Sequence, residues 1–100
     1  MSLNITKNIG ESSIITLEGR LDTTTAPELD KLVDEICDST NSLTFDVEKL
    51  EYVSSAGLRV FLKAQKAMSK KGGLKLIHVS DAVKEVLDIT GFSDFITIQD

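Results

Sequence analysis

The hydrophobic pattern divides the chain into short segments typical of strands and of helices. From Ser42 to Val47, polar and apolar side chains alternate, which is the period-2 pattern of a half-buried strand. After Gly57 the spacing changes to that of a helix, with the repeating positions Leu58, Phe61, Leu62, Gln65 and Met68. The pattern therefore predicts that a strand ends and a helix begins near Ser54 and Ser55, and the rest of the chain is organised around this junction.

The N-terminal segment predicts an antiparallel hairpin. Leu3 to Lys7 and Ser13 to Leu17 are short alternating or β-branched runs. The residues between them include Asn8 and Gly10, which favour a turn. We expect Gly19 to end the second strand.

A helix is predicted to begin near Thr25. Thr25 and Glu28 have the spacing of a capping box, and Pro27 is tolerated in a first helical turn. The residues that follow form a one-sided apolar stripe, predicted to cover a sheet face, at Leu29, Leu32, Val33, Ile36 and Cys37.

The C-terminal third predicts a strand, a helix and a last strand. Gly72 and Gly73 stop the central helix, and Leu74 to Val79 reads as a strand. Ser80 is expected to cap a helix that Gly91 closes, with an apolar face made by Val83, Val86 and Leu87. Phe92 to Ile98 should supply the final short strand.

The order β-β-α-β-α-β-α-β predicts one α/β domain over residues 1–100. Strands that alternate with helices imply parallel neighbours joined by right-handed crossovers, and the initial hairpin adds an antiparallel pair. We therefore expect a single mixed sheet of about four to five strands, with the helices packed mainly on one face.

Composition and charge narrow the classes of function. Hydrophobic residues at 41% and charged residues at 27% are ordinary globular values, and no apolar run approaches the ~20 residues of a membrane span. The N-terminus lacks the apolar stretch of a signal peptide, so we expect a cytoplasmic protein without a membrane partner. The net charge of −5 disfavours direct nucleic-acid binding. A monomer is the expected state.

The reactive side chains give little support for catalysis or metal binding. The single cysteine, Cys37, excludes an intramolecular disulfide and is interpreted as a core residue; His78 is interpreted as a strand-surface or hydrogen-bonded histidine. The lysines at 63, 66, 70 and 71 are interpreted as the solvated face and C-terminal end of the central helix. Neither a Gly-x-Ser-x-Gly elbow nor a P-loop pattern occurs, so we expect no enzyme, cofactor or metal.

The serines at the strand–helix junction allow two interpretations. A serine oxygen there can accept a hydrogen bond from a backbone N–H of the first turn, a cap that stabilises a helix by about 1 kcal/mol. Alternatively, a phosphate on the serine would be favoured by the helix dipole and the unpaired N–H groups. The chemistry of the residues alone leaves both open.

Two stretches resemble the STAS domains of anti-sigma factor antagonists. Tyr52-Val53-Ser54-Ser55-Ala56-Gly57-Leu58 is similar to the phosphorylation motif of that family, which usually reads Asp-Ser-Ser/Thr-Gly-Leu after two apolar residues. The segment from Leu17 to Leu29 resembles the family's Gly-x-Leu-Asp stretch before the first helix. Alignment on Gly57 and Leu58 puts Ser55 at the phosphoacceptor position, Ser54 where the family has Asp, and Ala56 where it has Ser or Thr.

The resemblance implies a STAS fold and a partner-switching function. The unmodified protein would bind an anti-sigma factor, a serine kinase of the GHKL type, and so release a sigma factor. That kinase would phosphorylate Ser55 and abolish binding, and a PPM-type serine phosphatase would restore it. The expected contact residues are Asp22, Thr23, Thr24, Ser54, Ser55, Ala56, Gly57 and Leu58, although Asp22 to Thr24 could equally serve to start and cap the helix. The alternative is a STAS scaffold without phosphorylation, a subunit of a larger signalling or lipid-transport assembly.

Overall fold

The computed structural model describes residues 3–91 and 97–98 and has the predicted order of elements. Its strands are β1 (Leu3–Asn8), β2 (Ser12–Leu21), β3 (Ser42–Val53), β4 (Leu74–Ile77) and β5 (Thr97–Ile98). Its helices are α1 (Ala26–Ile36), α2 (Ser55–Met68) and α3 (Asp81–Thr90). Residues 92–96 of the predicted last strand lie outside the described residues.

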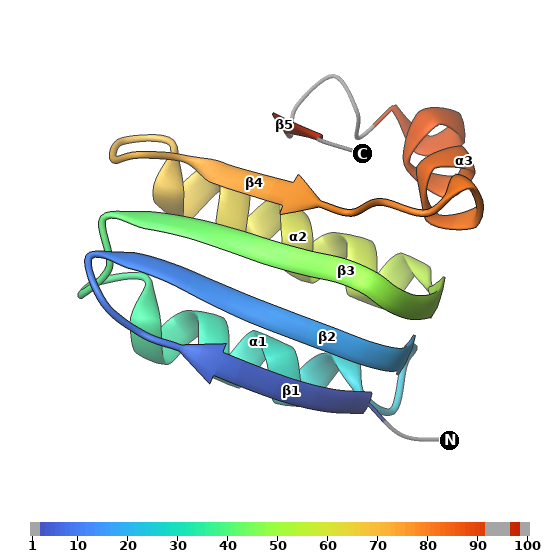
Figure 1. The fold of residues 1–100 in the computed structure, drawn as a ribbon, viewed down its shortest axis with the longest axis horizontal. Coiled ribbons are helices and arrows are strands. Elements are labelled where there is room, and N and C mark those ends of the chain that lie inside the picture. Colours follow the sequence, from blue (N-terminus) through green and yellow to red (C-terminus); the bar gives the residue numbers. More distant parts are fainter. Residues whose placement is uncertain (1–2, 92–96, 99–100) are drawn as a thin grey trace.

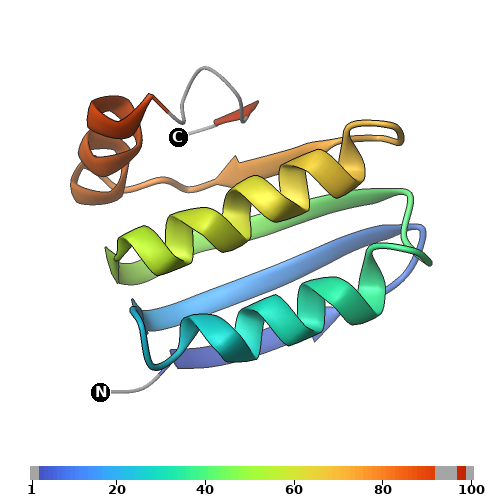
Figure 2. The ribbon, with the colours of Figure 1, turned by 180° about the vertical axis from the view of Figure 1, so that it is seen from behind.

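The strands form one mixed sheet in the order β1-β2-β3-β4-β5. β1 is antiparallel to β2, and every other neighbouring pair is parallel. α1 and α2 lie side by side on one face of the sheet, whereas α3 lies beyond the end of β4 (Figures 1 and 2). The predicted hairpin, the mixed sheet and the one-sided helix layer are thus confirmed.

The core lies between the sheet and the two helices. The inward positions of β2 and β3 are fully buried, and the rings of Phe45 on β3 and Phe61 on α2 have centroids 5.2 Å apart. The apolar stripe of α1 is buried as predicted, including Cys37. On α2 the buried positions include Val60 and Ala64, while Leu62 is only half-buried, so the buried face is rotated slightly from the one predicted.

Three strand boundaries differ from the prediction. β2 continues through Gly19, which has a φ of 111°, to Leu21. The register with β3 shifts twice in this region, and at both shifts the extra residue lies on β3. Gly19 therefore does not end the strand, and the irregularities in this pairing are bulges of β3. β3 extends six residues past Val47 to Val53, and β4 ends at Ile77, before the predicted Val79.

The helix ends confirm two predicted caps and correct a third. Ser80 accepts a hydrogen bond from Val83 N–H at 3.3 Å, and Gly91 adopts a left-handed φ of 81°. The capping box at Thr25 is wrong: its hydroxyl makes no cap to the helix and instead donates to Arg20 O at 2.8 Å. α1 nevertheless begins directly after Thr25, with Pro27 in its first turn.

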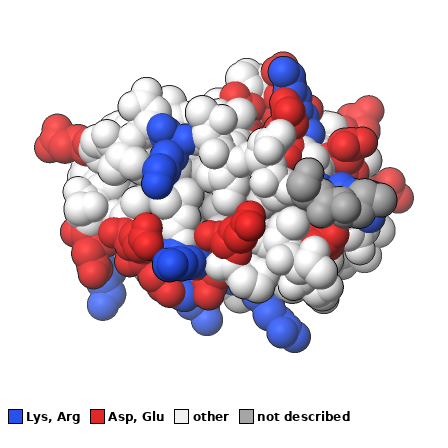
Figure 3. Space-filling view, turned by 90° about the horizontal axis from the view of Figure 1, so that it is seen from below, with Lys and Arg blue, Asp and Glu red and all other residues white. Residues whose placement is uncertain are grey.

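Charged side chains are distributed without a single-sign patch on the side that Figure 3 shows. There, acidic and basic side chains are intermixed, and the acidic ones are in the majority. In the predicted lysine group, Lys63 contacts α1 through Asp30 and Asp34, and Lys71 donates to the carbonyls of Cys37 and Thr40. These two lysines therefore hold other segments and are not simply solvated.

His78 lies just after β4 and not on the strand surface. Its backbone has a left-handed φ of 56°, and its Nδ1 lies 3.0 Å from Asp46 Oδ1 on β3. The histidine is hydrogen-bonded, as one form of the prediction had it. No helix among residues 3–91 is long and apolar enough to cross a membrane.

Candidate functional site

The two sequence motifs meet at one edge of the sheet. β2 and β3 are parallel, with Leu21 opposite Val53 at their C-terminal ends. Directly beyond this pair, Ser54 N–H donates to Leu21 O at 2.8 Å. The loop that follows β2 and the first turn of α2 are therefore neighbours, which is the usual consequence of parallel strands ending at the same edge.

Gly57 allows the first turn of α2 to approach β2 closely. A Cβ atom on Gly57 would lie 2.6 Å from Leu21 Cγ and 3.2 Å from Leu21 O. Both distances are shorter than ordinary van der Waals contact, so a larger residue fits only if the Leu21 side chain or the backbone beside it moves. The glycine of the motif thus has a packing role that is specific to this junction.

The structure distinguishes the two serines by their hydrogen bonds. Ser54 has extended backbone angles at the N-cap, and its Oγ accepts from Gly57 N–H at 3.3 Å. Ser55 is the first residue of α2 and is exposed. Within residues 3–91 and 97–98, the Ser55 hydroxyl makes no hydrogen bond. Ser54 is therefore the cap, and Ser55 has a hydroxyl that the fold does not use.

Asp22 organises the loop beside these serines. Its Oδ1 accepts from Thr24 Oγ1 at 2.7 Å, from Thr24 N–H at 3.0 Å and from Thr25 N–H at 3.1 Å. The hydrogen bond from the Thr24 hydroxyl is the largest cause of a lowered pKa for the Asp22 carboxyl. The carboxylate thus orders the turn that leads into α1 without capping a helical N–H, while Thr23 and Thr24 are exposed.

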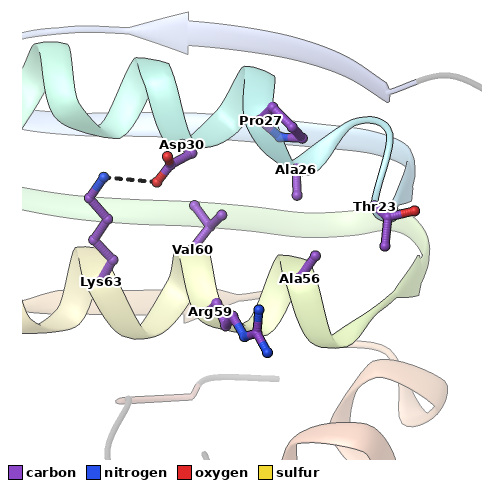
Figure 4. A pocket seen from close by; sticks show the side chains of 8 residues that line it. All are labelled: Thr23, Ala26, Pro27, Asp30, Ala56, Arg59, Val60 and Lys63. Carbon is purple, nitrogen blue, oxygen red and sulfur yellow. Dashed lines mark hydrogen bonds and ion pairs between the residues drawn. The ribbon is translucent and has the colours of Figure 1, made fainter.

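A groove of about 400 Å³ runs between α1 and α2 next to the serines (Figure 4). Its apolar lining comes from Ala26, Pro27, Ala56 and Val60, and its polar lining from Thr23, Asp30, Arg59 and Lys63. Of the predicted contact residues, Thr23 and Ala56 line this groove. Gly57 and Leu58 are buried beneath the surface, so they shape the site without being exposed in it.

Lys63 bridges the two helices along the groove. Its Nζ lies 2.9 Å from Asp30 Oδ1 and 2.6 Å from Asp34 Oδ1, both on α1. The hydrogen bonds that Lys63 donates to Asp34 and then to Asp30 raise the pKa of its ammonium group. This cation is therefore neutralised by carboxylates of the same molecule and offers little net charge to a partner.

Sequence reasoning missed the groove, Arg59 and a contact on the open sheet face. The Arg20 guanidinium lies 4.5 Å from the centroid of the Tyr52 ring, at opposed positions of β2 and β3. The small residues Ala26 and Ala56, each in a first helical turn, were the signal that could have indicated the groove. Among the described residues, no group of three or more His, Cys, Asp or Glu side chains is arranged to hold a metal ion.

Known proteins are similar to this chain in both sequence and fold. The family model described as the STAS domain matches residues 1–100. The anti-sigma-B factor antagonist of Bacillus subtilis (strain 168) is 31% identical over 100 residues, which are 98% of this chain and 92% of that protein.

Two solved structures extend the likeness to the fold. An anti-sigma factor antagonist from Mycobacterium paratuberculosis superposes with a TM-score of 0.89 at 21% identity, over 98% of this chain and 86% of that one. The Bacillus cell fate determinant SpoIIAA in its phosphorylated form superposes with a TM-score of 0.74 at 16% identity, over 97% and 90% of the two chains. At these identities the structures show the fold alone.

Proposed function

Because the chain belongs to the STAS domain family, we propose that it is an anti-sigma factor antagonist whose partner binding is switched off by phosphorylation of Ser55. The unmodified protein binds an anti-sigma factor and so releases a sigma factor. The relative named an anti-sigma-B factor antagonist, which this chain matches over nearly its whole length, supports this assignment. We expect the protein to act as a monomer in the cytoplasm.

The main observation that supports phosphorylation of Ser55 is that the two adjacent serines differ in their hydrogen bonds. Ser54 caps α2, whereas Ser55 is exposed and its hydroxyl is unbonded within the described residues. Modification of Ser55 therefore removes no hydrogen bond that holds the helix. A phosphate at this position also lies at the positive end of the helix dipole, so the fold tolerates it.

The same phosphate would oppose partner binding through charge and size. It adds about −1.5 to −2 charges at pH 7 to a surface of small neutral residues around Ser55 and Ala56. A partner surface that is complementary to the neutral form would meet repulsion and an uncompensated desolvation cost. Affinity would fall without any refolding of the domain.

We propose that one kinase phosphorylates Ser55 and that one phosphatase dephosphorylates it. The anti-sigma factor, a serine kinase of the GHKL type, transfers the γ-phosphoryl group of ATP to Ser55 Oγ; the bond to the β-phosphate breaks, and the hydroxyl proton is released. A PPM-type serine phosphatase hydrolyses the phosphoserine with water. Asp22, Thr23 and Thr24, on the loop that follows β2, are proposed as further contacts for these partners, together with Ala56.

The first experiment is phosphorylation in vitro followed by mass analysis. The protein is incubated with ATP and the GHKL-type kinase encoded nearest to it, and intact mass and fragment spectra locate any phosphate. We expect one phosphate on Ser55, none in Ser55→Ala, and a phosphate that is still on Ser55 in Ser54→Ala. Ser54→Ala is the control, because it removes the adjacent hydroxyl and leaves Ser55 in place. It shows whether loss of phosphate in Ser55→Ala comes from the missing acceptor or from a disturbed first turn of α2.

Absence of a phosphate on Ser55 would favour the alternative function, a STAS scaffold without phosphorylation. Ser54 stands where the family motif has Asp, so the negative charge that normally precedes the phosphoacceptor is absent from this chain. If an active kinase leaves Ser55 unmodified, or modifies another residue, the phosphorylation switch is wrong. The domain would then be a STAS scaffold within a larger signalling or transport assembly.

A further inference from the structure

Arg59 lies one helical turn after Ser55 on the same face of α2. Residues four apart on a helix are neighbours at its surface, and long helical side chains lean back toward the N-terminus. Arg59 is exposed and lines the groove. Figure 4 shows its guanidinium extending along α2 toward the end of the helix where Ala56 lies.

The guanidinium of Arg59 has no interaction partner in the part of the chain that the structure describes. Within residues 3–91 and 97–98 it has no hydrogen bond, ion pair or aromatic contact. The next cation along this face, Lys63, is held by Asp30 and Asp34 on α1. The carboxylate of Asp22, on the loop after β2, accepts hydrogen bonds from Thr24 and Thr25 through its Oδ1 and makes no ion pair with Arg59.

We infer that Arg59 binds the phosphate on Ser55 and holds it against the first turn of α2. This assignment rests on the proposed phosphorylation and names the residue that responds to it. A guanidinium presents a planar fork that matches two phosphate oxygens, and an anion placed four residues before a cation is the favourable order on a helix. The backbone N–H groups of the first turn and the Arg59 fork then face the phosphate from two sides.

This ion pair gives phosphorylation a second effect on the groove. Two cations line the groove, and Lys63 is already paired with carboxylates of α1. Before modification, Arg59 has no carboxylate partner within the described residues, so its guanidinium is available to an acidic group of the anti-sigma factor. After modification, the phosphate occupies the guanidinium and draws it to the helix terminus. One modification thus adds negative charge to the surface and removes a positive contact from it.

The test measures the phosphate pKa in the absence of any kinase or partner. Phosphoserine is introduced at position 55 during synthesis, in the wild-type background and in Arg59→Gln, Arg59→Lys and Lys66→Gln. Lys66 is an exposed lysine of α2 about three turns beyond Ser55, so Lys66→Gln matches the loss of one positive charge at a distance from the phosphate. The phosphate is then titrated by ³¹P NMR at low salt, and far-UV circular dichroism checks that each variant is folded.

We expect the pKa for the second ionisation of the phosphate to rise by about 0.5 unit in Arg59→Gln and by less than about 0.2 unit in Lys66→Gln. Arg59→Lys should lie between the wild type and Arg59→Gln, because it retains the charge but not the fork. The effect of Arg59→Gln should shrink at high salt.

Equal pKa values in Arg59→Gln and Lys66→Gln would overturn the inference, because the guanidinium would then act only as a distant charge. Failure of the kinase to modify Ser55 would instead overturn the proposed function. The two results are independent, since the phosphate in this test is installed without the kinase.

Discussion

At the scale of single residues, adjacent side chains in the 54–57 segment have different physical roles. Ser54 accepts from Gly57 N–H, Ser55 is exposed with an unused hydroxyl, and Gly57 makes room for Leu21. These roles predict different consequences of substitution at positions that are next to one another. Stability measurements can therefore separate them before any partner is known.

The two serines should differ in their effect on stability. We expect Ser54→Ala to lower the free energy of unfolding by about 1 kcal/mol, because it removes the cap of α2, and Ser55→Ala to change it by less than about 0.5 kcal/mol. Urea unfolding followed by circular dichroism measures both. If Ser55→Ala were the more destabilising substitution, the assignment of the cap to Ser54 would be wrong.

Gly57→Ala should destabilise the domain although alanine favours helices. Its Cβ would meet Leu21 at 2.6 Å, and overpacking of this kind costs typically 1–3 kcal/mol. Gly10→Ala is the matched control, because a Cβ on Gly10 has no atom within 4 Å. Urea unfolding of the two variants provides the comparison, and similar stabilities would show that the close approach of Gly57 to Leu21 is not a constraint.

The sequence predicted residue roles only where local spacing determines them. The Ser80 cap and the Gly91 stop follow from neighbours within one helical turn, and both are confirmed. The capping box at Thr25 has the correct local spacing, yet the hydroxyl donates to Arg20 O, which the turn of the chain brings near. The competing acceptor lies on the preceding strand, so the helical pattern gave no sign of it.

At the scale of elements, the pair formed by His78 and Asp46 links the end of β4 to the neighbouring strand β3. The hydrogen bond with Asp46 is the largest cause of a raised pKa for His78. Since the folded-state pKa is above the unfolded value near 6.5, the pair stabilises the fold fully below about pH 6.5. That contribution is lost as the pH rises through the raised pKa.

We therefore expect the stability difference between wild type and His78→Asn to be larger at about pH 5.5 than at about pH 8.5. Asn suits this position because it tolerates the left-handed φ of 56°. Urea unfolding of both proteins at the two pH values measures the difference. A difference that does not change with pH would contradict the role of the charged pair.

The sequence predicted whether a segment is a strand or a helix more accurately than it predicted where the segment ends. Alternation identified β2 and β3, but Gly19 was interpreted as a stop, whereas β2 continues through it with a positive φ and the pairing is kept by bulges of β3. β3 runs on through Glu48 to Val53, where strict alternation breaks down. The extension follows from pairing with β2, a partner that periodicity within one segment does not reveal.

At the scale of the whole molecule, the proposed switch lies at one end of the sheet. Ser55 follows the C-terminal end of β3, while the turn between β1 and β2 lies at the opposite end. The topology was predicted correctly because alternating strands and helices permit few arrangements. The groove between α1 and α2 was not, because it depends on how two helices far apart in the sequence pack.

Ser55→Asp should weaken binding to the anti-sigma factor at least about tenfold, or about 1.4 kcal/mol, because it places a charge in the proposed contact surface. Asn8→Asp adds the same charge at the exposed opposite end of the sheet and should leave affinity nearly unchanged. Isothermal titration calorimetry against the unphosphorylated partner compares the two variants. Tighter binding by Ser55→Asp than by wild type would refute the charge-repulsion mechanism.

The burial of Cys37 makes the chain well suited to site-specific labelling. The sequence contains one cysteine, and burial is the largest cause of the raised pKa of its thiol, so little of the reactive thiolate is present at neutral pH. A Gly10→Cys substitution would place an accessible thiol in open space at the end of the sheet away from Ser55. A maleimide dye attached there would report complex formation by fluorescence anisotropy without occupying the proposed contact surface.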